Sequence, residues 1–216
     1  MTDAMAMPVE VLLVDDERDV TDALAWLLDS VKIPSRAFSS ATEFLATIGE
    51  LQGPACAVLD LRMPEMSGLE LQQRLLEAGQ DMPLIFLTAH GDVPAAVNAM
   101  QAGAVDFVQK PFNPDAFLAS VRRAIRMARE RFAQRKSDLG LRKRLAQLSA
   151  REYDVLRGLL DGRTSKEIAR TLEISPKTVD VHRANVMRKM GVGTSAELLR
   201  LLGKSTELPE PVLPRR

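Results

Sequence analysis

A short apolar run that ends in an acid, Ala55 to Asp60, constrains the fold of this chain more than any other segment. The run Ala55 to Leu59 is too short for a helix and is typical of a strand buried on both faces, while the MPEMSG segment after it is typical of a turn. Asp60 is therefore predicted at the carboxyl end of a strand. In open parallel α/β sheets the ligand crevice lies outside those ends, although an aspartate there can equally cap a turn.

Strands and helices alternate along the first half of the chain. Apolar segments of strand length begin at Val9, Ser35, Ala55, Pro83 and Val105. Between them lie apolar residues at helical spacing and helix-start signals, such as a capping box over residues 40–43 and an N-cap at Asp92. This alternation predicts one doubly wound α/β domain, a five-stranded parallel sheet covered by helices on both faces.

The predicted strands place five polar side chains at one edge of the sheet. Their carboxyl ends carry Asp15 and Asp16 on the first strand, Asp60 on the third, Thr88 on the fourth and Lys110 on the fifth. Clustered carboxylates repel one another and favour a hard divalent cation, and Mg²⁺ needs only two carboxylates and a backbone carbonyl besides water. An aspartate beside a metal ion, with a lysine and a hydroxyl for incoming oxygens, is suited to phosphoryl transfer onto Asp60.

The same carboxylates would also serve a Mg²⁺-dependent phosphatase or phosphotransferase. Asp60 is followed by Leu61 and Arg62, however, whereas the haloacid-dehalogenase type of phosphatase carries a second acid two residues after its nucleophile. No glycine-rich phosphate-binding loop is found, so we expect no ATPase module. These features favour a phosphoacceptor protein, which catalyses at most its own phosphorylation and dephosphorylation, over an enzyme.

The charges cancel in total but are divided along the chain. Residues 1–118 hold 6 Lys and Arg against 18 Asp and Glu, residues 119–148 hold 10 against 2, and residues 149–216 hold 13 against 9. An acidic half joined to a basic half predicts a C-terminal part that binds nucleic acid. No apolar run reaches the length of a membrane span and no signal peptide is recognisable, so we expect a cytoplasmic protein with no membrane partner.

Four helices are predicted in the basic half. Capping boxes begin the first two at Ser149 and Thr164, Ser175 followed by Pro176 begins a longer helix that ends at Met190, and the last covers residues 195–202. The short turn over residues 173–175 joins the second and third helices as in a helix-turn-helix. The C-terminal domain is therefore predicted to be an all-α, four-helix domain.

The helical period separates the two faces of the helix after Ser175. Val179, Val186 and Met190 fall on one face and are predicted to pack in the core. The second helix of a helix-turn-helix lies in the major groove, so the other residues are predicted to meet bases or nearby phosphates. The predicted DNA-binding residues are Lys177, Thr178, Val181, Ala184, Asn185 and Arg188 on this helix, with Thr164, Ser165 and Lys166 on phosphates before it.

Two known domain families share these motifs. The segments VLLVDDE, VLDLRMPEMSGLEL, LTAHGD and FVQKPF resemble the receiver domain of bacterial two-component response regulators, which has a flavodoxin-like fold. The segment LSAREYDVLRGLLDGRTSKEIARTLEISPKTVDVHRANVMRKMGV resembles the LuxR-type DNA-binding domain. Together the two resemble the FixJ/NarL group of transcriptional regulators.

The resemblance implies a role for each residue of the crevice. Asp60 would be the phosphoacceptor, and Mg²⁺ would be bound by Asp15, Asp16, Asp60 and the backbone carbonyl of Arg62. Thr88 and Phe107 would form a switch pair, Lys110 would contact phosphoryl oxygens, and the Lys110–Pro111 peptide bond would be cis. The implied partners are a sensor histidine kinase, double-stranded DNA, RNA polymerase and a second copy of the chain in a phosphorylation-linked homodimer.

The expected organisation is a receiver domain (1–125), a helical linker (126–147), a LuxR-type helix-turn-helix domain (148–203) and a disordered tail (204–216). The helical pattern of the linker is expected to break near Gly140, where Leu139 and Leu141 fall out of phase. Two readings of the linker stay open, a solvated helix and a dimerising one. His90 either faces the crevice and tunes hydrolysis of the phosphate or is an ordinary loop residue.

Overall fold

The computed structural model describes residues 7–89 and 93–203. These residues form two compact units, Met1–Arg135 and Lys136–Arg216, and each unit is described by itself. The division falls inside the segment predicted as a linker, and the exact domain bounds remain a prediction. Three sequence predictions, for His90, for the N-cap at Asp92 and for the tail 204–216, lie outside the described residues.

The first unit contains the predicted five-stranded sheet. Its strands are β1 Glu10–Val14, β2 Ser35–Phe38, β3 Ala55–Asp60, β4 Leu84–Thr88 and β5 Asp106–Gln109. All pairings are parallel, and the strand order is β2-β1-β3-β4-β5. Because the order reverses between β1 and β3, their carboxyl ends border a crevice at the point where ligands bind in such sheets.

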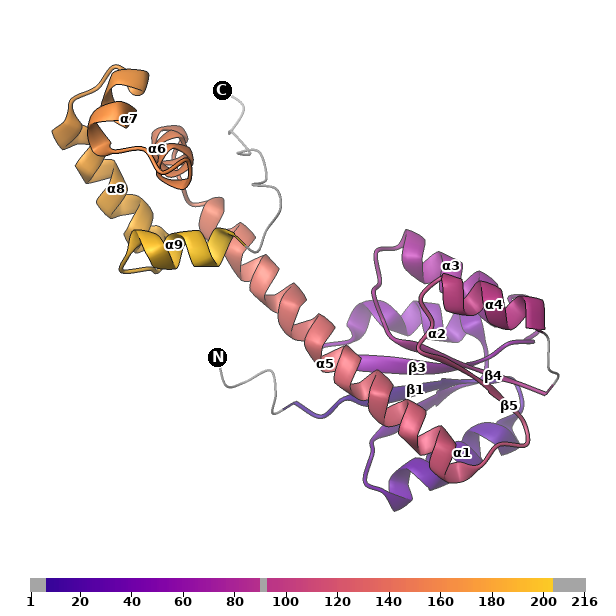
Figure 1. Cartoon of the computed structure of the whole chain (residues 1–216). Helices are drawn as coiled ribbons and strands as arrows, with labels where there is room; N and C mark the ends of the chain where they lie inside the picture. Colours follow the sequence, from indigo (N-terminus) through magenta and orange to yellow (C-terminus); the bar gives the residue numbers. More distant parts are fainter. Residues whose placement is uncertain (1–6, 90–92, 204–216) are drawn as a thin grey trace. The chain divides into compact units, whose positions relative to one another are not determined.

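Helices cover both faces of this sheet (Figure 1). One face packs against α1 (Arg18–Ser30) and the first part of α5 (Pro114–Leu145). The other packs against α2 (Ala41–Thr47), the 3-10 turn η1 (Ile48–Glu50), α3 (Gly68–Glu77) and α4 (Val93–Gln101). Successive residues of β1 enter opposite cores, Val11 and Leu13 one, Leu12 and Val14 the other, as the alternation of a strand requires. The predicted doubly wound α/β fold is confirmed.

Ser40 caps α2 as predicted, but the capping box is not the predicted one. The Ser40 hydroxyl accepts a hydrogen bond from the backbone N–H of Glu43. The Glu43 carboxylate, however, accepts from the N–H and hydroxyl of Ser39 rather than from the Ser40 backbone. The helix start is therefore correct, whereas the return bond reaches one residue further back.

Helix α5 is continuous from Pro114 to Leu145, so the predicted break near Gly140 is wrong. A glycine inside a helix costs only about 1 kcal/mol, and the surrounding Arg, Lys, Leu, Ala and Gln residues are good helix formers. Leu139 is 52% exposed, whereas Leu141 packs against the core of the second unit. The out-of-phase leucine is therefore a surface residue.

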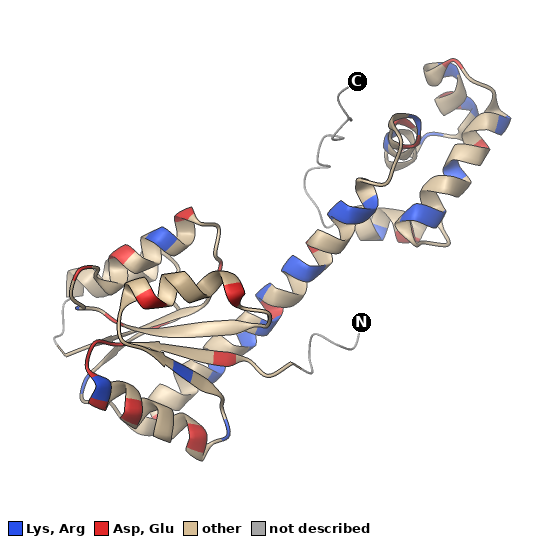
Figure 2. Ribbon diagram, turned by 180° about the vertical axis from the view of Figure 1, so that it is seen from behind, with Lys and Arg blue, Asp and Glu red and all other residues tan. Residues whose placement is uncertain are grey.

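Polar contacts hold α5 against the first unit beyond the edge of the sheet. Asp106 of β5 accepts hydrogen bonds from the Ser120 hydroxyl and from Arg123, whose Nη2 lies 2.6 Å from its carboxylate. About three turns after Ser120, Arg131 forms an ion pair with Asp81 at 2.5 Å. Lys and Arg recur along the rest of the helix (Figure 2). These contacts tie α5 to the first unit as far as Arg131.

The second unit is the predicted set of helices. It contains the end of α5 with α6 (Ala150–Leu160), α7 (Ser165–Leu172), α8 (Pro176–Met190) and α9 (Ser195–Leu202). The predicted capping boxes at Ser149 and Thr164 are both complete. The turn after α7 passes through Glu173 at φ 55°, after which α8 begins at its Ser175 cap. No helix among the described residues is long and apolar enough to cross a membrane.

Candidate functional site

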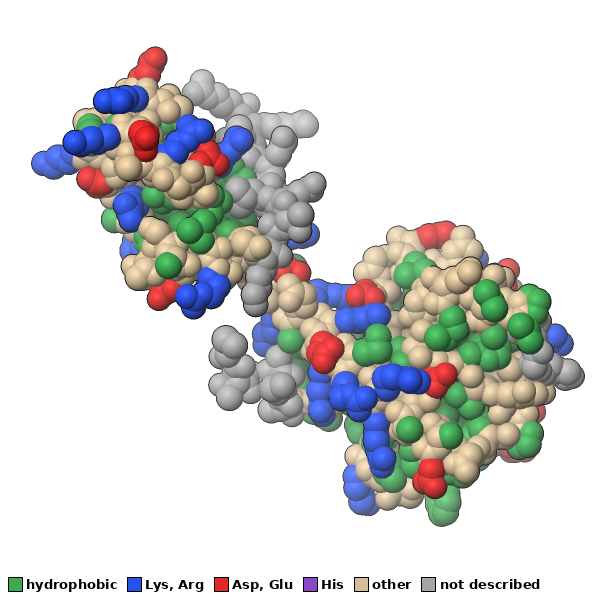
Figure 3. All heavy atoms as spheres, viewed as in Figure 1, with side chains coloured by type: hydrophobic (Ala, Val, Ile, Leu, Met, Phe, Trp, Pro, Cys, Tyr) green, Lys and Arg blue, Asp and Glu red, His purple; other side chains and the backbone are tan. Residues whose placement is uncertain are grey.

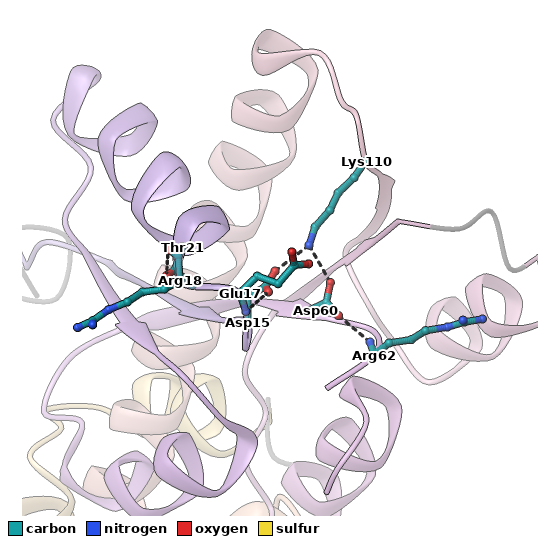
Figure 4. Close-up of polar contacts among 7 residues, drawn as sticks. All are labelled: Asp15, Glu17, Arg18, Thr21, Asp60, Arg62 and Lys110. Atoms are coloured by element: carbon teal, nitrogen blue, oxygen red, sulfur yellow. Dashed lines mark hydrogen bonds and ion pairs between the residues drawn. The ribbon is translucent and has the colours of Figure 1, made fainter. Parts of the chain in front are cut away.

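Two aspartates and a lysine meet at the carboxyl edge of the sheet (Figure 4). Asp15 follows β1, Asp60 ends β3 and Lys110 follows β5. The Lys110 ammonium lies 2.8 Å from Oδ2 of Asp15 and 2.9 Å from Oδ1 of Asp60. The parallel sheet thus brings together residues that are up to 95 positions apart in the sequence.

The second oxygen of each carboxylate is held by the backbone. Oδ1 of Asp15 accepts from the N–H of Glu17 at 3.0 Å, and Oδ2 of Asp60 accepts from the N–H of Arg62 at 2.7 Å. Both aspartates are largely buried, with 2% and 7% of their surface exposed. Their orientation is therefore fixed from two sides before any ligand arrives.

The charges of the site are coupled through Lys110. Burial raises the pKa of Asp15, an effect that the Lys110 hydrogen bond and the Glu17 N–H only partly offset. Burial by itself lowers the pKa of Lys110, but hydrogen bonds and charges from Asp15 and Asp60 outweigh it, so the pKa of Lys110 is raised. Lys110 is therefore a cation at neutral pH, suited to bind phosphoryl oxygens as a point charge.

The other predicted crevice residues take different positions. Asp16 is exposed and makes no hydrogen bond or ion pair with the other described residues. Within the described part of the chain no three His, Cys, Asp or Glu side chains are placed to hold a metal ion together. Two carboxylates and one backbone carbonyl suffice for a hydrated Mg²⁺ ion, and the structure brings the carboxylates of Asp15 and Asp60 to one place. The structure therefore joins two of the three predicted carboxylates.

The predicted switch residues lie on neighbouring strands. Thr88 ends β4 and is fully buried, and Phe107 of β5 is partly buried. The Phe107 ring packs against Phe86, two residues before Thr88, with ring centroids 6.4 Å apart. The Lys110–Pro111 peptide bond is cis, as the resemblance implied.

Gly68 lies against the backbone of Asp60, although the sequence placed it only at the end of the turn that follows Asp60. A Cβ atom at Gly68 would lie 2.4 Å from the backbone oxygen of Asp60 and 3.0 Å from the Phe86 ring. The start of α3 therefore approaches the end of β3 more closely than any side chain allows. The signal available in the sequence was a glycine at the first helical position, where a better helix former is normally favoured.

We expect Gly68→Ala to destabilise the first unit by about 1–3 kcal/mol, because the methyl group must displace the Asp60 backbone. The predicted phosphorylation of Asp60 by acetyl phosphate should slow as well. Gly49→Ala is the matched control, since no atom lies within 4 Å of its added Cβ. Urea denaturation together with the labelling rate measures both effects, and equal behaviour of the two variants would contradict the role given to Gly68.

The second unit presents an exposed face on α8. Val179, Val186 and Met190 are fully buried, as predicted, and Val181 on the opposite side is 56% exposed. The remaining predicted contacts are exposed or partly exposed: Lys177, Thr178, Ala184, Asn185 and Arg188 on α8, and Ser165 and Lys166 on α7. A row of short and basic side chains on the second helix of a helix-turn-helix suits the major groove.

Two polar residues of this face are already engaged in the fold. The Thr164 hydroxyl donates to the Glu167 carboxylate at 2.7 Å as part of its capping box. The Ser165 hydroxyl donates to Oδ1 of Asp180 at 2.8 Å, which ties α7 to α8. Asp180, an acid next to the predicted DNA face, therefore has a structural partner.

A buried ion pair fixes α8 against α6, and sequence analysis missed it. Glu152 of α6 is 5% exposed, and one of its oxygens lies 2.6 Å from Nζ of Lys189. The same carboxylate accepts from the Ser149 N–H, and Lys189 also donates to the carbonyl of Gln147. The capping box marked Glu152, but nothing in the sequence indicated that its partner lies 37 residues later.

Comparison with known proteins identifies both units. Residues 11–122 match the family model "Response regulator receiver domain", and residues 146–202 match "Bacterial regulatory proteins, luxR family". The response regulator protein TmoT of Ectopseudomonas mendocina is 42% identical over 191 residues, 88% of this chain and 86% of that protein. The transcriptional regulatory protein FixJ of Azorhizobium caulinodans is 43% identical over 196 residues, 91% of this chain and 92% of that protein.

Solved structures give the same result. The structure of the response regulator StyR is similar with a TM-score of 0.80 and 38% identity, covering 92% of this chain and all of that one. Full-length FixJ from B. japonicum is similar with a TM-score of 0.55 and 40% identity, covering 92% of this chain and 98% of that one. The similarity therefore extends over both units.

Proposed function

Because the chain belongs to the FixJ/NarL group of DNA-binding two-component response regulators, we propose that Asp60 accepts a phosphoryl group from a sensor histidine kinase. One observation carries this assignment. Asp60 is the acid at the end of β3 that is held by the Arg62 N–H on one oxygen and by Lys110 on the other. The Asp60 carboxylate is thus held beside the Lys110 ammonium group, which can move to bind the negative oxygens of a newly attached phosphoryl group.

The proposed step is a displacement at phosphorus. A carboxylate oxygen of Asp60 forms the new P–O bond while the P–N bond to the kinase histidine breaks, and the imidazole leaves with the bonding pair. Lys110, which now bridges Asp15 and Asp60, turns towards the phosphoryl oxygens. Asp15, Asp16, Asp60 and the Arg62 carbonyl would hold a Mg²⁺ ion, which would supply charge neutralisation there.

We propose that phosphorylation acts on Thr88 and Phe107 and, through them, on dimerisation. A phosphoryl group adds about −1.5 to −2 charge, which changes what Lys110 and Thr88 bind. The surface next to Phe107 carries exposed apolar residues of α4, with Val97 48% and Met100 46% exposed. Figure 3 shows hydrophobic side chains gathered over this helix. A second phosphorylated copy covering this face would bring two DNA-binding units together.

The receiver and LuxR-type domains are those of a regulator. We propose that any catalysis is limited to its own phosphorylation and dephosphorylation. RNA polymerase is the proposed target of the DNA-bound regulator, and the cytoplasm is the proposed location.

On the DNA side, we propose that α8 lies in the major groove with its Lys177 to Arg188 face against the bases, while Lys166 contacts a phosphate. Val181→Lys should then change the preferred sequence, because it replaces an apolar contact with a donor at the centre of the exposed face. Lys166→Ala should weaken binding to every sequence and lower the slope of log K against log salt by about one unit.

Binding-site selection and salt titrations measure these two outcomes. If the Val181→Lys variant selects the sequence that the unmodified protein selects, the placement of α8 is wrong. If Lys166→Ala leaves the salt slope unchanged, Lys166 contacts no phosphate.

A further inference from the structure

His182 of α8 has one ring nitrogen without a partner inside the second unit. Among the residues that the structure describes, its Nδ1 atom is buried and makes no hydrogen bond. The side chain as a whole is only partly buried. The other ring nitrogen, Nε2, also makes no hydrogen bond with a described residue. It is not among the buried atoms that lack a partner, so it is accessible to solvent.

This asymmetry selects one protonation state of the ring. Imidazolium and the Nδ1–H tautomer both place an N–H in a buried position with no acceptor, which costs free energy. The Nε2–H tautomer places only a lone pair there and directs its N–H to the accessible side. His182 is therefore a neutral donor whose hydrogen points out of the core.

The position of His182 on α8 locates that donor. At about 100° per residue, His182 falls between the buried row of Val179 and Val186 and the exposed row of Val181. Lys189, seven residues later, lies on the same side of the helix and binds Glu152 of α6. The donor is thus at the edge of the exposed face, on the side where α6 packs.

An edge position selects the acceptor. Side chains at the centre of a recognition helix reach base edges, whereas those on its flank meet the sugar-phosphate backbone beside the groove. We infer that Nε2–H of His182 donates a hydrogen bond to a DNA phosphate oxygen and thereby fixes the depth and rotation of α8 in the groove. This inference rests on the proposed placement of α8.

A neutral donor has a signature that separates it from a lysine or arginine. Binding by a neutral N–H releases no counterion, so its loss lowers affinity without changing the salt slope. Glutamine and asparagine are the matched variants. The Gln amide nitrogen reaches the position of Nε2, whereas the Asn amide reaches only that of Nδ1.

The test is fluorescence anisotropy of the full-length, acetyl phosphate-treated protein on its selected duplex at several salt concentrations. His182→Gln should bind within about twofold of the unmodified protein, and His182→Asn about tenfold more weakly, the loss of one hydrogen bond to a charged acceptor, with equal salt slopes. The inference is wrong if the His182→Asn variant binds DNA as tightly as the protein without the substitution, or if its salt slope is lower by about one unit.

A second measurement uses the protein without any substitution, so it does not require a variant to fold. Long-range ¹H–¹⁵N spectra of the full-length protein, free and bound to DNA, distinguish the tautomers directly. The Nε2–H tautomer is expected in both states, and an Nδ1–H or imidazolium ring in either overturns the inference.

Val181→Lys distinguishes a wrong placement of α8 from a wrong role for His182. If Val181→Lys shifts the preferred sequence while the His182 variants bind like the protein without a substitution, α8 lies in the groove and only the role of His182 is wrong.

Discussion

Asp60→Asn is expected to abolish phosphorylation of this protein by acetyl phosphate. The asparagine keeps an oxygen that accepts from the Arg62 N–H, so the strand end should keep its shape, but the amide cannot attack phosphorus. Phosphorylation-dependent dimerisation and the accompanying gain in DNA affinity should disappear with the label. Mass spectrometry, gel filtration and DNA binding, each with and without acetyl phosphate, measure the three effects.

The control for this experiment is Asp22→Asn, an exposed acid on α1 that is outside the crevice. It should take up phosphate at the rate of the unmodified protein. Acid-stable labelling of the Asp60→Asn variant on serine or threonine would show that the nucleophile is another residue. If the protein without a substitution becomes labelled and yet keeps the oligomeric state and DNA affinity that it has without acetyl phosphate, the assignment of Asp60 as phosphoacceptor is kept. In that case the proposed effect on dimerisation through α4 and β5 is wrong.

The main parts of the fold could be predicted because local signals agreed with one another. Short apolar runs alternated with helical patterns, and capping boxes at Ser149 and Thr164 marked helix starts that the structure repeats. The crevice followed from the sheet: if Asp60 and Lys110 both end parallel strands, they must share an edge. Similarly, the period of α8 separated Val179 and Val186 from Val181 without any knowledge of what packs against them.

Long-range partners could not be predicted in the same way. The clash at Gly68 depends on how α3 meets the end of β3, and the Glu152–Lys189 pair depends on how α6 crosses α8. A local sequence pattern does not determine how α3 meets β3 or how α6 crosses α8. Near Gly140 the local pattern was misleading, because helix propensity summed over its neighbours outweighs one glycine. Asp16 shows the remaining limit, since it stands next to Asp15 in the sequence but is exposed and takes no part in the contacts between Asp15, Asp60 and Lys110.

The Glu152–Lys189 ion pair predicts a large loss of stability in the second unit. Breaking a buried pair by removing one partner costs about 3–5 kcal/mol, and because the Lys189 side chain is 24% exposed we expect about 2–3 kcal/mol for Glu152→Ala. In a unit of this size that lowers the melting temperature by roughly 10 °C or more. In a Trp26→Phe background, which removes the tryptophan emission of the first unit, urea denaturation followed by the fluorescence of Tyr153, the single tyrosine of the chain, reports on this unit.

The control variant is Glu167→Ala, because Glu167 belongs to the same kind of capping box as Glu152 but forms no buried ion pair with the described residues. Glu167 closes the same kind of box with Thr164 on the surface, so Glu167→Ala should cost far less. In a double-mutant cycle, Lys189→Met combined with Glu152→Ala should destabilise less than the sum of the two single changes, because the pair is lost only once. Additive losses would mean that Glu152 acts through its cap alone.

The ion pair also sets the acid limit of the second unit. Burial raises the pKa of Glu152, but the Lys189 hydrogen bond and charge and the Ser149 contacts outweigh it, so its pKa lies below the ordinary value of 4.5. A carboxyl whose pKa is lowered on folding stabilises fully above its unfolded pKa and loses that contribution as pH falls through its folded pKa. The unmodified protein should therefore lose stability below about pH 4.5 more steeply than Glu152→Ala, which lacks the titrating group. Parallel curves for the two proteins between pH 7 and pH 3 would show that the Glu152 carboxylate is not stabilised by Lys189.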